Sequence, residues 1–171
     1  ANLLSLSSLA SDLTITYAKA EKFLLALEHT FVVKTLKPFY RNLTTEIKKA
    51  PKLYFLDLGL RNAVLDNFMQ FDKRSDASLL IENHVFLELL KNFDGKINFW
   101  RTTGKAEVDF VLSKEGRIMP VEVKLSGKPG KSFHSFLKAY KPERGLIVTL
   151  DKFERFKIRD TLVYKVPVFY L

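Results

Sequence analysis

The hydrophobic positions of the first sixty residues follow two different periods. Residues 5–13 and 16–28 have the three-to-four-residue spacing of helices, and a short turn at 14–16 separates them. The spacing within the second helix predicts a buried apolar stripe made of Ala20, Phe23, Leu24 and Leu27. Residues 31–36 and 52–60 are rich in β-branched and aromatic side chains, which favours two strands joined by an exposed loop.

The order helix, turn, helix and hairpin is typical of a winged helix-turn-helix. In such a module the second helix enters a major groove and the wing contacts phosphates. We therefore expect DNA contacts from Lys19 and Lys22 on the second helix, and from Arg41, Lys48 and Lys49 in the loop between the two strands. Modules of this shape also serve as protein-docking surfaces, so both uses remain open at this point.

A polar connection at residues 57–78 separates this segment from a second hydrophobic block. We expect one unit at residues 1–72, with the winged segment and a connecting helix, and a second unit at 73–171. The second unit has the element order helix, three strands, helix and strand, at residues 78–93, 97–103, 106–113, 117–125, 131–140 and 145–150. This order predicts the α/β class, with a mixed sheet flanked by helices.

One carboxylate of the helix at 78–93 lies on its apolar side. Glu82 shares a helical stripe with Val85 and Phe86, whereas Glu88 lies on the polar side. A carboxylate on an apolar stripe is costly unless it meets a cation, a metal or hydrogen-bond donors. A buried salt bridge is the simpler explanation for Glu82, and a metal site is the alternative.

The strands at 106–113 and 117–125 carry further carboxylates. Alternation predicts one apolar face, with Val108, Phe110 and Leu112, and one charged face that holds Glu107 and Asp109. If Glu115 and Gly116 form a two-residue turn, Asp109 lies directly opposite Glu122. Like charges on opposed strand positions are destabilising, so this arrangement favours a cation between them.

A divalent metal would give these residues a common chemistry. We expect Mg²⁺, or Mn²⁺, to be held by Asp109, Glu122 and the carbonyl of Val123, with Glu82 completing the metal shell. A bound metal makes its water a nucleophile, and Lys124 would orient that water or neutralise charge on an attacked phosphate. The predicted product is a cleaved phosphodiester.

The amino-acid composition limits the kinds of partner and site that we expect. The chain has 28 Lys and Arg against 19 Asp and Glu, and the resulting net charge of +9 favours nucleic acid as a partner. We therefore add Lys128 and Lys131 to the expected nucleic-acid contacts, although a basic surface can also serve solubility alone. The chain has no cysteine, which excludes disulfides, thiolate catalysis and cysteine-zinc sites. It has neither a glycine-rich phosphate loop nor an apolar run long enough for a membrane span, so we expect no ATPase site, no membrane contact and a cytoplasmic protein. Because the chain begins with Ala1, we expect a piece of a longer polypeptide.

The polar residues resemble the site of the PD-(D/E)XK nuclease superfamily, which includes restriction endonucleases and archaeal Holliday-junction resolvases. Glu82 on the helix, Asp109 on a strand and the "EVK" of Glu122 to Lys124 occur in the order of that family's elements. Val108 precedes Asp109, where that family commonly has proline. The resemblance implies a restriction-endonuclease-like sheet in which these four residues form a metal-dependent catalytic site for DNA.

A second resemblance covers nearly the whole chain. The phrases "KAPKLYFLDLGLRNAVL", "LIENHVFLELL", "FWRTTGKAEVDFVL", "MPVEVKLS" and "YKPERGLIVT" are similar to the C-terminal region that follows an AAA+ ATPase module in archaeal and bacterial ATPases. That family implies a winged-helix segment joined to a nuclease-like domain, with ATP handled by the N-terminal part. Two function classes follow: a magnesium-dependent DNA nuclease, or a nuclease-fold module that binds DNA or protein and regulates the ATPase.

Overall fold

The computed structural model describes residues 3–40, 50–125 and 128–171. The N-terminal part contains α1 (Leu6–Asp12), α2 (Tyr17–His29), β1 (Val33–Leu36) and β2 (Lys52–Phe55), and the two strands pair antiparallel. Each helix begins at a hydroxyl cap, because Ser5 accepts a hydrogen bond from the Ser8 amide and Thr16 accepts one from the Lys19 amide. Two helices followed by two strands were predicted, and their order is confirmed.

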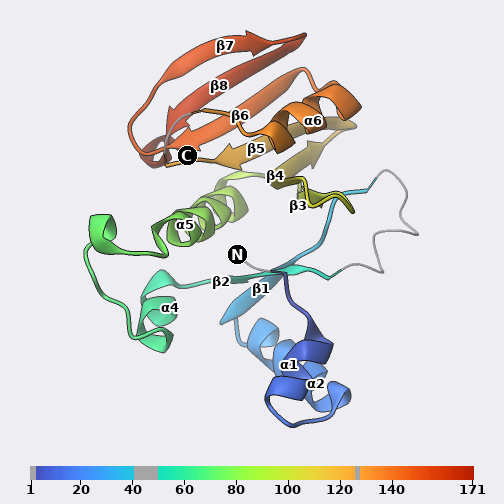
Figure 1. The fold of residues 1–171 in the computed structure, drawn as a ribbon, viewed down its shortest axis with the longest axis vertical. Helices are drawn as coiled ribbons and strands as arrows, with labels where there is room; N and C mark the ends of the chain where they lie inside the picture. Colours follow the sequence, from blue (N-terminus) through green and yellow to red (C-terminus); the bar gives the residue numbers. More distant parts are fainter. Residues whose placement is uncertain (1–2, 41–49, 126–127) are drawn as a thin grey trace.

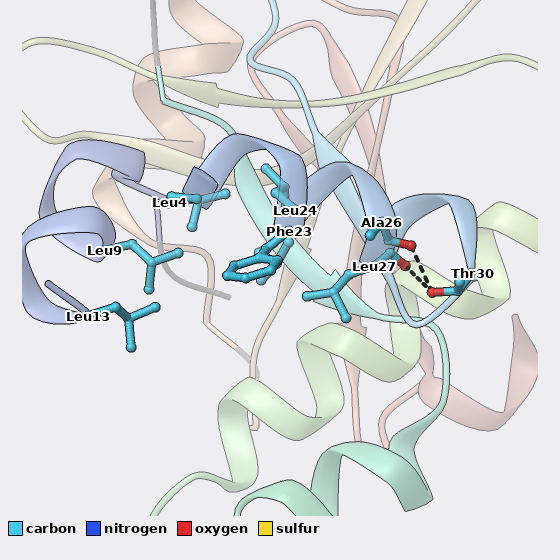
Figure 2. Close-up of a pocket in the computed structure, with 10 residues that line it drawn as sticks. Leu4, Leu9, Leu13, Phe23, Leu24, Ala26, Leu27 and Thr30 are labelled. Atoms are coloured by element: carbon cyan, nitrogen blue, oxygen red, sulfur yellow. Dashed lines mark hydrogen bonds between the residues drawn. The ribbon is translucent and has the colours of Figure 1, made fainter. Parts of the chain in front are cut away.

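The apolar stripe of α2 is buried only in part. Ala20 is 1% exposed, but Phe23 is 52% and Leu27 is 41% exposed. With Leu9 and Leu13 of α1, these side chains line an open apolar groove of about 500 Å³ (Figure 2). The prediction of a buried core stripe is therefore wrong for Phe23 and Leu27, because the short α1 covers α2 on one side and leaves the groove open.

The connection between the two sequence blocks is held by a charged network. It contains α4 (Leu58–Val64) and the short helix η1 (Phe71–Lys73), and it leads into the long α5 (Ala77–Asn92). Asp76 takes the N-cap position of α5 without capping it, because its carboxylate is paired with Arg61 at 2.9 Å and Arg74 at 2.9 Å. These ion pairs tie the connection to the start of α5.

The C-terminal part is a six-stranded mixed sheet. Its elements are β3 (Lys96–Arg101), β4 (Glu107–Lys114), β5 (Arg117–Val123), α6 (Lys131–Tyr140), β6 (Arg144–Thr149), β7 (Glu154–Ile158), β8 (Thr161–Pro167) and η2 (Val168–Tyr170). The strand order is β3-β4-β5-β6-β8-β7, with β5, β6 and β8 parallel and the other pairs antiparallel. The predicted helix and strand order is confirmed as far as β6, and the hairpin of β7 and β8 extends it.

Helices cover both faces of this sheet. Residues of α5 share one hydrophobic cluster with Phe110, Val121 and Val148, and residues of α6 share the other with Val111 and Ile147. Figure 1 shows α5 between the sheet and the β1–β2 pair. The α5-side cluster therefore receives side chains from β1 and β2 as well as from the sheet.

Tyr54 of β2 is the clearest example of this shared core. Its side chain is fully buried, and its ring stacks on Phe86 of α5 with 4.4 Å between the centroids. Strand β2 is thus packed against the C-terminal part, next to the carboxylates predicted to be functional. Within the described residues, no helix is long and apolar enough to cross a membrane.

Candidate functional site

The hairpin of β4 and β5 has the predicted turn and register. Lys114 pairs with Arg117 across Glu115 and Gly116, whose φ angles are 52° and 75°. Positive φ at both central residues is the conformation of a tight two-residue hairpin turn. The ladder continues to the pair of Phe110 with Val121, so the next opposed positions are Asp109 and Glu122.

A bulge in β4 changes the predicted faces. The ladder with β3 shifts by one residue between Asn98 and Trp100, so two residues of β4 take one position there. As a result Val108 and Val111 contact the α6-side cluster, whereas Phe110 and Leu112 contact the α5-side cluster. The predicted single apolar face of Val108, Phe110 and Leu112 is therefore wrong, because strict alternation ends at the bulge next to Asp109.

Glu82 points inward, as its position on the stripe predicts, and it meets a lysine and a tyrosine there. Its side chain accepts hydrogen bonds from Tyr54 Oη at 2.6 Å and from Lys52 Nζ at 3.0 Å, both on the same oxygen. Burial raises the pKa of Glu82, whereas the charge of Lys52 and the Tyr54 hydrogen bond are among the interactions that lower it, and the resulting pKa lies below the ordinary value. Glu82 is therefore a charged carboxylate that is held in a buried salt bridge.

Lys52 joins Glu82 to β4. Its ammonium lies 2.6 Å from Glu107 Oε1, and the side chain is 1% exposed. Glu107 is in turn paired with Arg101 at 2.9 Å. Burial lowers the pKa of Lys52, but the negative charges of Glu82, Asp109 and Glu107 raise it above its ordinary value. Lys52 is therefore a fixed positive charge among three carboxylates.

Asp109 lies between this group and β5. Its Oδ2 accepts a hydrogen bond from the backbone amide of Val123 at 2.8 Å. Burial, together with the nearby charges of Glu82 and Glu122, raises the pKa of Asp109 to about 7, although Lys52 and the Val123 amide oppose this shift. At neutral pH this carboxyl group is therefore close to half-protonated.

Glu122 lies on the other side of Asp109, toward α6. It is 3% exposed, accepts a hydrogen bond from the Gly130 amide at 3.2 Å and is paired with Lys124 at 3.1 Å. A side chain at position 130 would meet this carboxylate, because a Cβ there would lie 2.8 Å from Glu122 Oε1. The absence of a side chain at Gly130 thus leaves space for the Glu122 carboxylate.

The four predicted residues, Glu82, Asp109, Glu122 and Lys124, lie in one region of the structure, but their side chains do not converge on a single metal site. Glu82 is engaged with Lys52 and Tyr54, and Glu122 is engaged with Lys124, with Asp109 between them. In the part of the chain that the structure describes, no group of three carboxylate or imidazole side chains could hold a metal. Asp109 and Glu122 alone fit a magnesium-type ion by their chemistry, because such an ion takes oxygen ligands, often one or two carboxylates, and keeps several waters.

The predicted nucleic-acid contacts are exposed where they can be located. Lys19 and Lys22 are exposed on α2, and Lys128 and Lys131 are exposed beside the start of α6. The loop residues Arg41, Lys48 and Lys49 lie outside the described residues. DNA binding by these residues remains a prediction.

The residues that the sequence interpretation missed come mainly from β2. Lys52 and Tyr54 occupy the two buried positions of a strand with alternating burial. A lysine two residues before a tyrosine on the inward face of a strand is a signal for a buried ion pair, since a buried ammonium needs a carboxylate partner. The sequence pattern of β2 alone does not indicate which carboxylate that is.

Comparison with known protein families divides the chain near the boundary between the two sequence blocks. The family model described as "Domain of unknown function (DUF4143)" matches residues 78–169, which is more than half of the chain. The chain belongs to the DUF4143 family. Residues 1–70 match another model, "Domain of unknown function (DUF8612)". The DUF4143 region holds Glu82, Asp109, Glu122 and Lys124, and Lys52 reaches them from the DUF8612 region.

Two curated relatives are longer than this chain. The chain is 28% identical over 166 residues to "Uncharacterized protein Rv2008c" of Mycobacterium tuberculosis and to "Uncharacterized protein Mb2031c" of Mycobacterium bovis. Each alignment covers 94% of this chain and 37% of the relative. The chain therefore spans well under half the length of these relatives, and both of its regions are aligned with them together.

Proposed function

We propose that this chain is a metal-dependent nuclease domain that hydrolyses phosphodiester bonds of DNA. The observation that carries the proposal is that Asp109 and Glu122 are the next residues of β4 and β5 beyond the pair of Phe110 with Val121, with Lys124 bound to Glu122 at 3.1 Å. Two carboxylates on neighbouring strands can hold a metal ion that activates water, and a lysine two residues along can neutralise phosphate charge, which suits metal-dependent phosphodiester hydrolysis.

Each residue of this site has a role that follows from its surroundings. Asp109 and Glu122 would hold Mg²⁺ or Mn²⁺, and a bound ion would supply an activated water and neutralise phosphate charge. The Lys124 side chain is 40% exposed, so its ammonium can contact both Glu122 and a phosphate that arrives from solvent. Gly130 positions the Glu122 carboxylate through its amide.

A second group of polar residues provides a place for the nucleic-acid backbone. A cavity of about 320 Å³ has Arg101, Thr102, Thr103 and Lys105 in its lining, together with Tyr40 and the apolar residues Leu3, Pro38, Ala50 and Phe99. Arg101 also pairs with Glu107, so this cavity lies beside the carboxylate group. Cations and hydroxyls are suitable donors for phosphate oxygens, and the net charge of +9 attracts a polyanion.

The finer fold assignments belong to the same proposal. A six-stranded mixed sheet with α5 and α6 on opposite faces supports a PD-(D/E)XK-like fold, and α1, α2, β1 and β2 support a winged-helix segment. The remaining length of the relatives leaves room for an AAA+ ATPase module in the whole protein. In that protein the nuclease would act under control of ATP.

A second candidate function is a binding module that regulates such an ATPase without cleavage. Two observations favour it. Lys52 already neutralises carboxylates near the site, and the α1–α2 groove exposes Phe23 and Leu27, which suits an apolar protein surface better than DNA. In this alternative the exposed lysines bind DNA and the groove binds protein.

Cleavage assays distinguish the two candidates. Linear duplex, single-stranded and branched DNA are incubated with the purified chain and Mg²⁺ or Mn²⁺, beside Asp109→Asn, Lys124→Ala and the exposed control Lys96→Ala. The nuclease proposal predicts cleavage that requires the metal, is lost in the first two variants and is kept in the control. Salt-sensitive DNA binding without cleavage, unchanged in Asp109→Asn, would instead support the binding module.

A further inference from the structure

We propose that the Lys52 ammonium is a built-in cation of this site: it takes the place of a metal ion between Glu82 and Glu107, so that divalent ions bind only at Asp109 and Glu122. This inference rests on the proposed function for the ion at Asp109 and Glu122. Its statement about Lys52 and Glu82 rests on contacts that are independent of catalysis. It assigns Lys52 as the counter-ion of Glu82 and Glu107.

The contacts of Lys52 are those of a bridging cation. Its Nζ lies 3.0 Å from Glu82 Oε1 on α5 and 2.6 Å from Glu107 Oε1 on β4. One positive centre thus connects carboxylates from a helix and a strand that are far apart in the sequence. A metal ion in a carboxylate cluster makes the same kind of connection, and the ammonium makes it with three N–H donors.

Lys52 is fixed in this position by the packing of β2. Lys52 is 1% exposed, and the ammonium lies 5.5 Å from the centroid of the Phe99 ring. Two residues along the strand, Tyr54 is fully buried, stacks on Phe86 and donates a hydrogen bond to Glu82. Withdrawal of β2 would expose this tyrosine and break its hydrogen bond to Glu82, which is unfavourable. Lys52 is therefore a permanent part of the site rather than a movable gate.

The charges on this side are compensated by the protein itself. Glu82 and Glu107 contact Lys52, and Glu107 also contacts Arg101. A divalent ion that bridged Glu82 Oε1 and Glu107 Oε1 would take the position that the Lys52 ammonium already occupies, so the ion and the ammonium exclude one another there. The described structure therefore leaves Asp109 and Glu122 as the carboxylates for a metal, and Glu82 as a fixed negative charge beside them.

One consequence concerns the two family regions. Lys52 and Tyr54 belong to the region of residues 1–70, and their carboxylate partners belong to residues 78–169. The two regions thus build one site together. We therefore expect a substitution of Lys52, in the first region, to change how the second region responds to a divalent ion.

The test measures divalent-ion binding directly, without an activity assay. Calorimetric titration with Mn²⁺ and thermal unfolding with and without Mn²⁺ are compared for the unmodified chain, Glu82→Gln, Asp109→Asn and Lys52→Met. Lys34→Met is the matched control, because Lys34 is an exposed lysine on the partner strand β1, opposite Tyr54. We expect Asp109→Asn to reduce Mn²⁺ affinity by at least about tenfold, and Glu82→Gln to reduce it by much less than Asp109→Asn does.

Lys52→Met gives the second readout. In Lys52→Met, Glu82 and Glu107 lose their common partner, so we expect this variant to have a lower unfolding temperature in metal-free buffer. We also expect Mn²⁺ to raise the unfolding temperature of Lys52→Met by more than it raises that of Lys34→Met. The additional Mn²⁺ effect is expected to disappear in Lys52→Met/Glu82→Gln. If Lys52→Met does not fold in metal-free buffer, recovery of folded protein with Mn²⁺ supports the proposal when the same Mn²⁺ concentration gives no such recovery in Lys52→Met/Asp109→Asn/Glu82→Gln but does in Lys52→Met/Asp109→Asn.

The inference is overturned if Glu82→Gln loses Mn²⁺ binding as strongly as Asp109→Asn. It is also overturned if Lys52→Met gains no stability from Mn²⁺ beyond the control, or stays unfolded with Mn²⁺. Absence of Mn²⁺ binding to the unmodified chain contradicts the proposed nuclease site. In that case the response of Lys52→Met still decides whether Lys52 occupies a cation position.

Discussion

Replacing Asp109 by asparagine is expected to remove a pH dependence of folding stability. The asparagine side chain keeps a carbonyl oxygen that can accept the Val123 amide hydrogen bond, but it cannot ionise. An aspartate in the unfolded chain titrates near about 3.9. In the folded protein the pKa of Asp109 is raised to about 7, first by burial and then by the charge of Glu82.

The sign of the effect follows from proton binding. Between about pH 4 and about pH 7 the folded state keeps a proton on Asp109 that the unfolded state releases. Stability is therefore lost as the pH rises through this window, and it is fully present below the unfolded pKa. A difference of about three pKa units corresponds to about 4 kcal/mol, which is an upper value because Asp109 keeps some solvent contact.

Denaturant unfolding of the two proteins, with a chelator present, measures this difference. The free energy of unfolding of Asp109→Asn minus that of the unmodified chain should increase steadily from about pH 4 to about pH 8. Asp94→Asn serves as the control, because the Asp94 side chain is 99% exposed and should show little of this trend. A difference for Asp109→Asn that stays constant with pH would refute the reasoning on its burial and charge environment.

Three further predictions concern single contacts. Tyr54→Phe removes the hydrogen bond to Glu82 but keeps the stacked ring, and should lower the free energy of unfolding by about 1.5–3 kcal/mol in denaturant titrations. Gly130→Ala should weaken Mn²⁺ binding measured by calorimetry, because its Cβ would lie 2.8 Å from Glu122 Oε1; unchanged affinity would contradict this. The hydrogen bond from Arg74 lowers the pKa of Asp76 to about 2, so Asp76→Asn should destabilise the protein at neutral pH. The difference in unfolding temperature between this variant and the unmodified chain should become smaller as the pH falls toward about 2, which thermal unfolding at several pH values tests.

Local features of the site could be predicted from the sequence. The spacing between Asp109 and Glu122 and the short Glu115–Gly116 turn fix the β4–β5 register, and the register was predicted correctly. The inward position of Glu82 also follows from helical period alone. These features depend on residues close together in the chain, where turn geometry and periodicity decide the outcome.

Features that depend on distant partners could not be predicted. The bulge beside Asp109 arises from the pairing of β4 with β3, and it moves Val108 to the opposite face from Phe110. The ion pair of Lys52 joins residues thirty positions apart, and nothing near Lys52 indicates its partner. The stripe of α2 was recognised by its period, but periodicity does not show whether another element covers it.

Anomalous X-ray scattering from crystals of this chain grown with Mn²⁺ would locate the bound ion directly. We expect one manganese ion coordinated by Asp109 and Glu122, with Lys52 still between Glu82 and Glu107. A manganese ion bound by Glu82, or no manganese ion at Asp109 and Glu122, would contradict it.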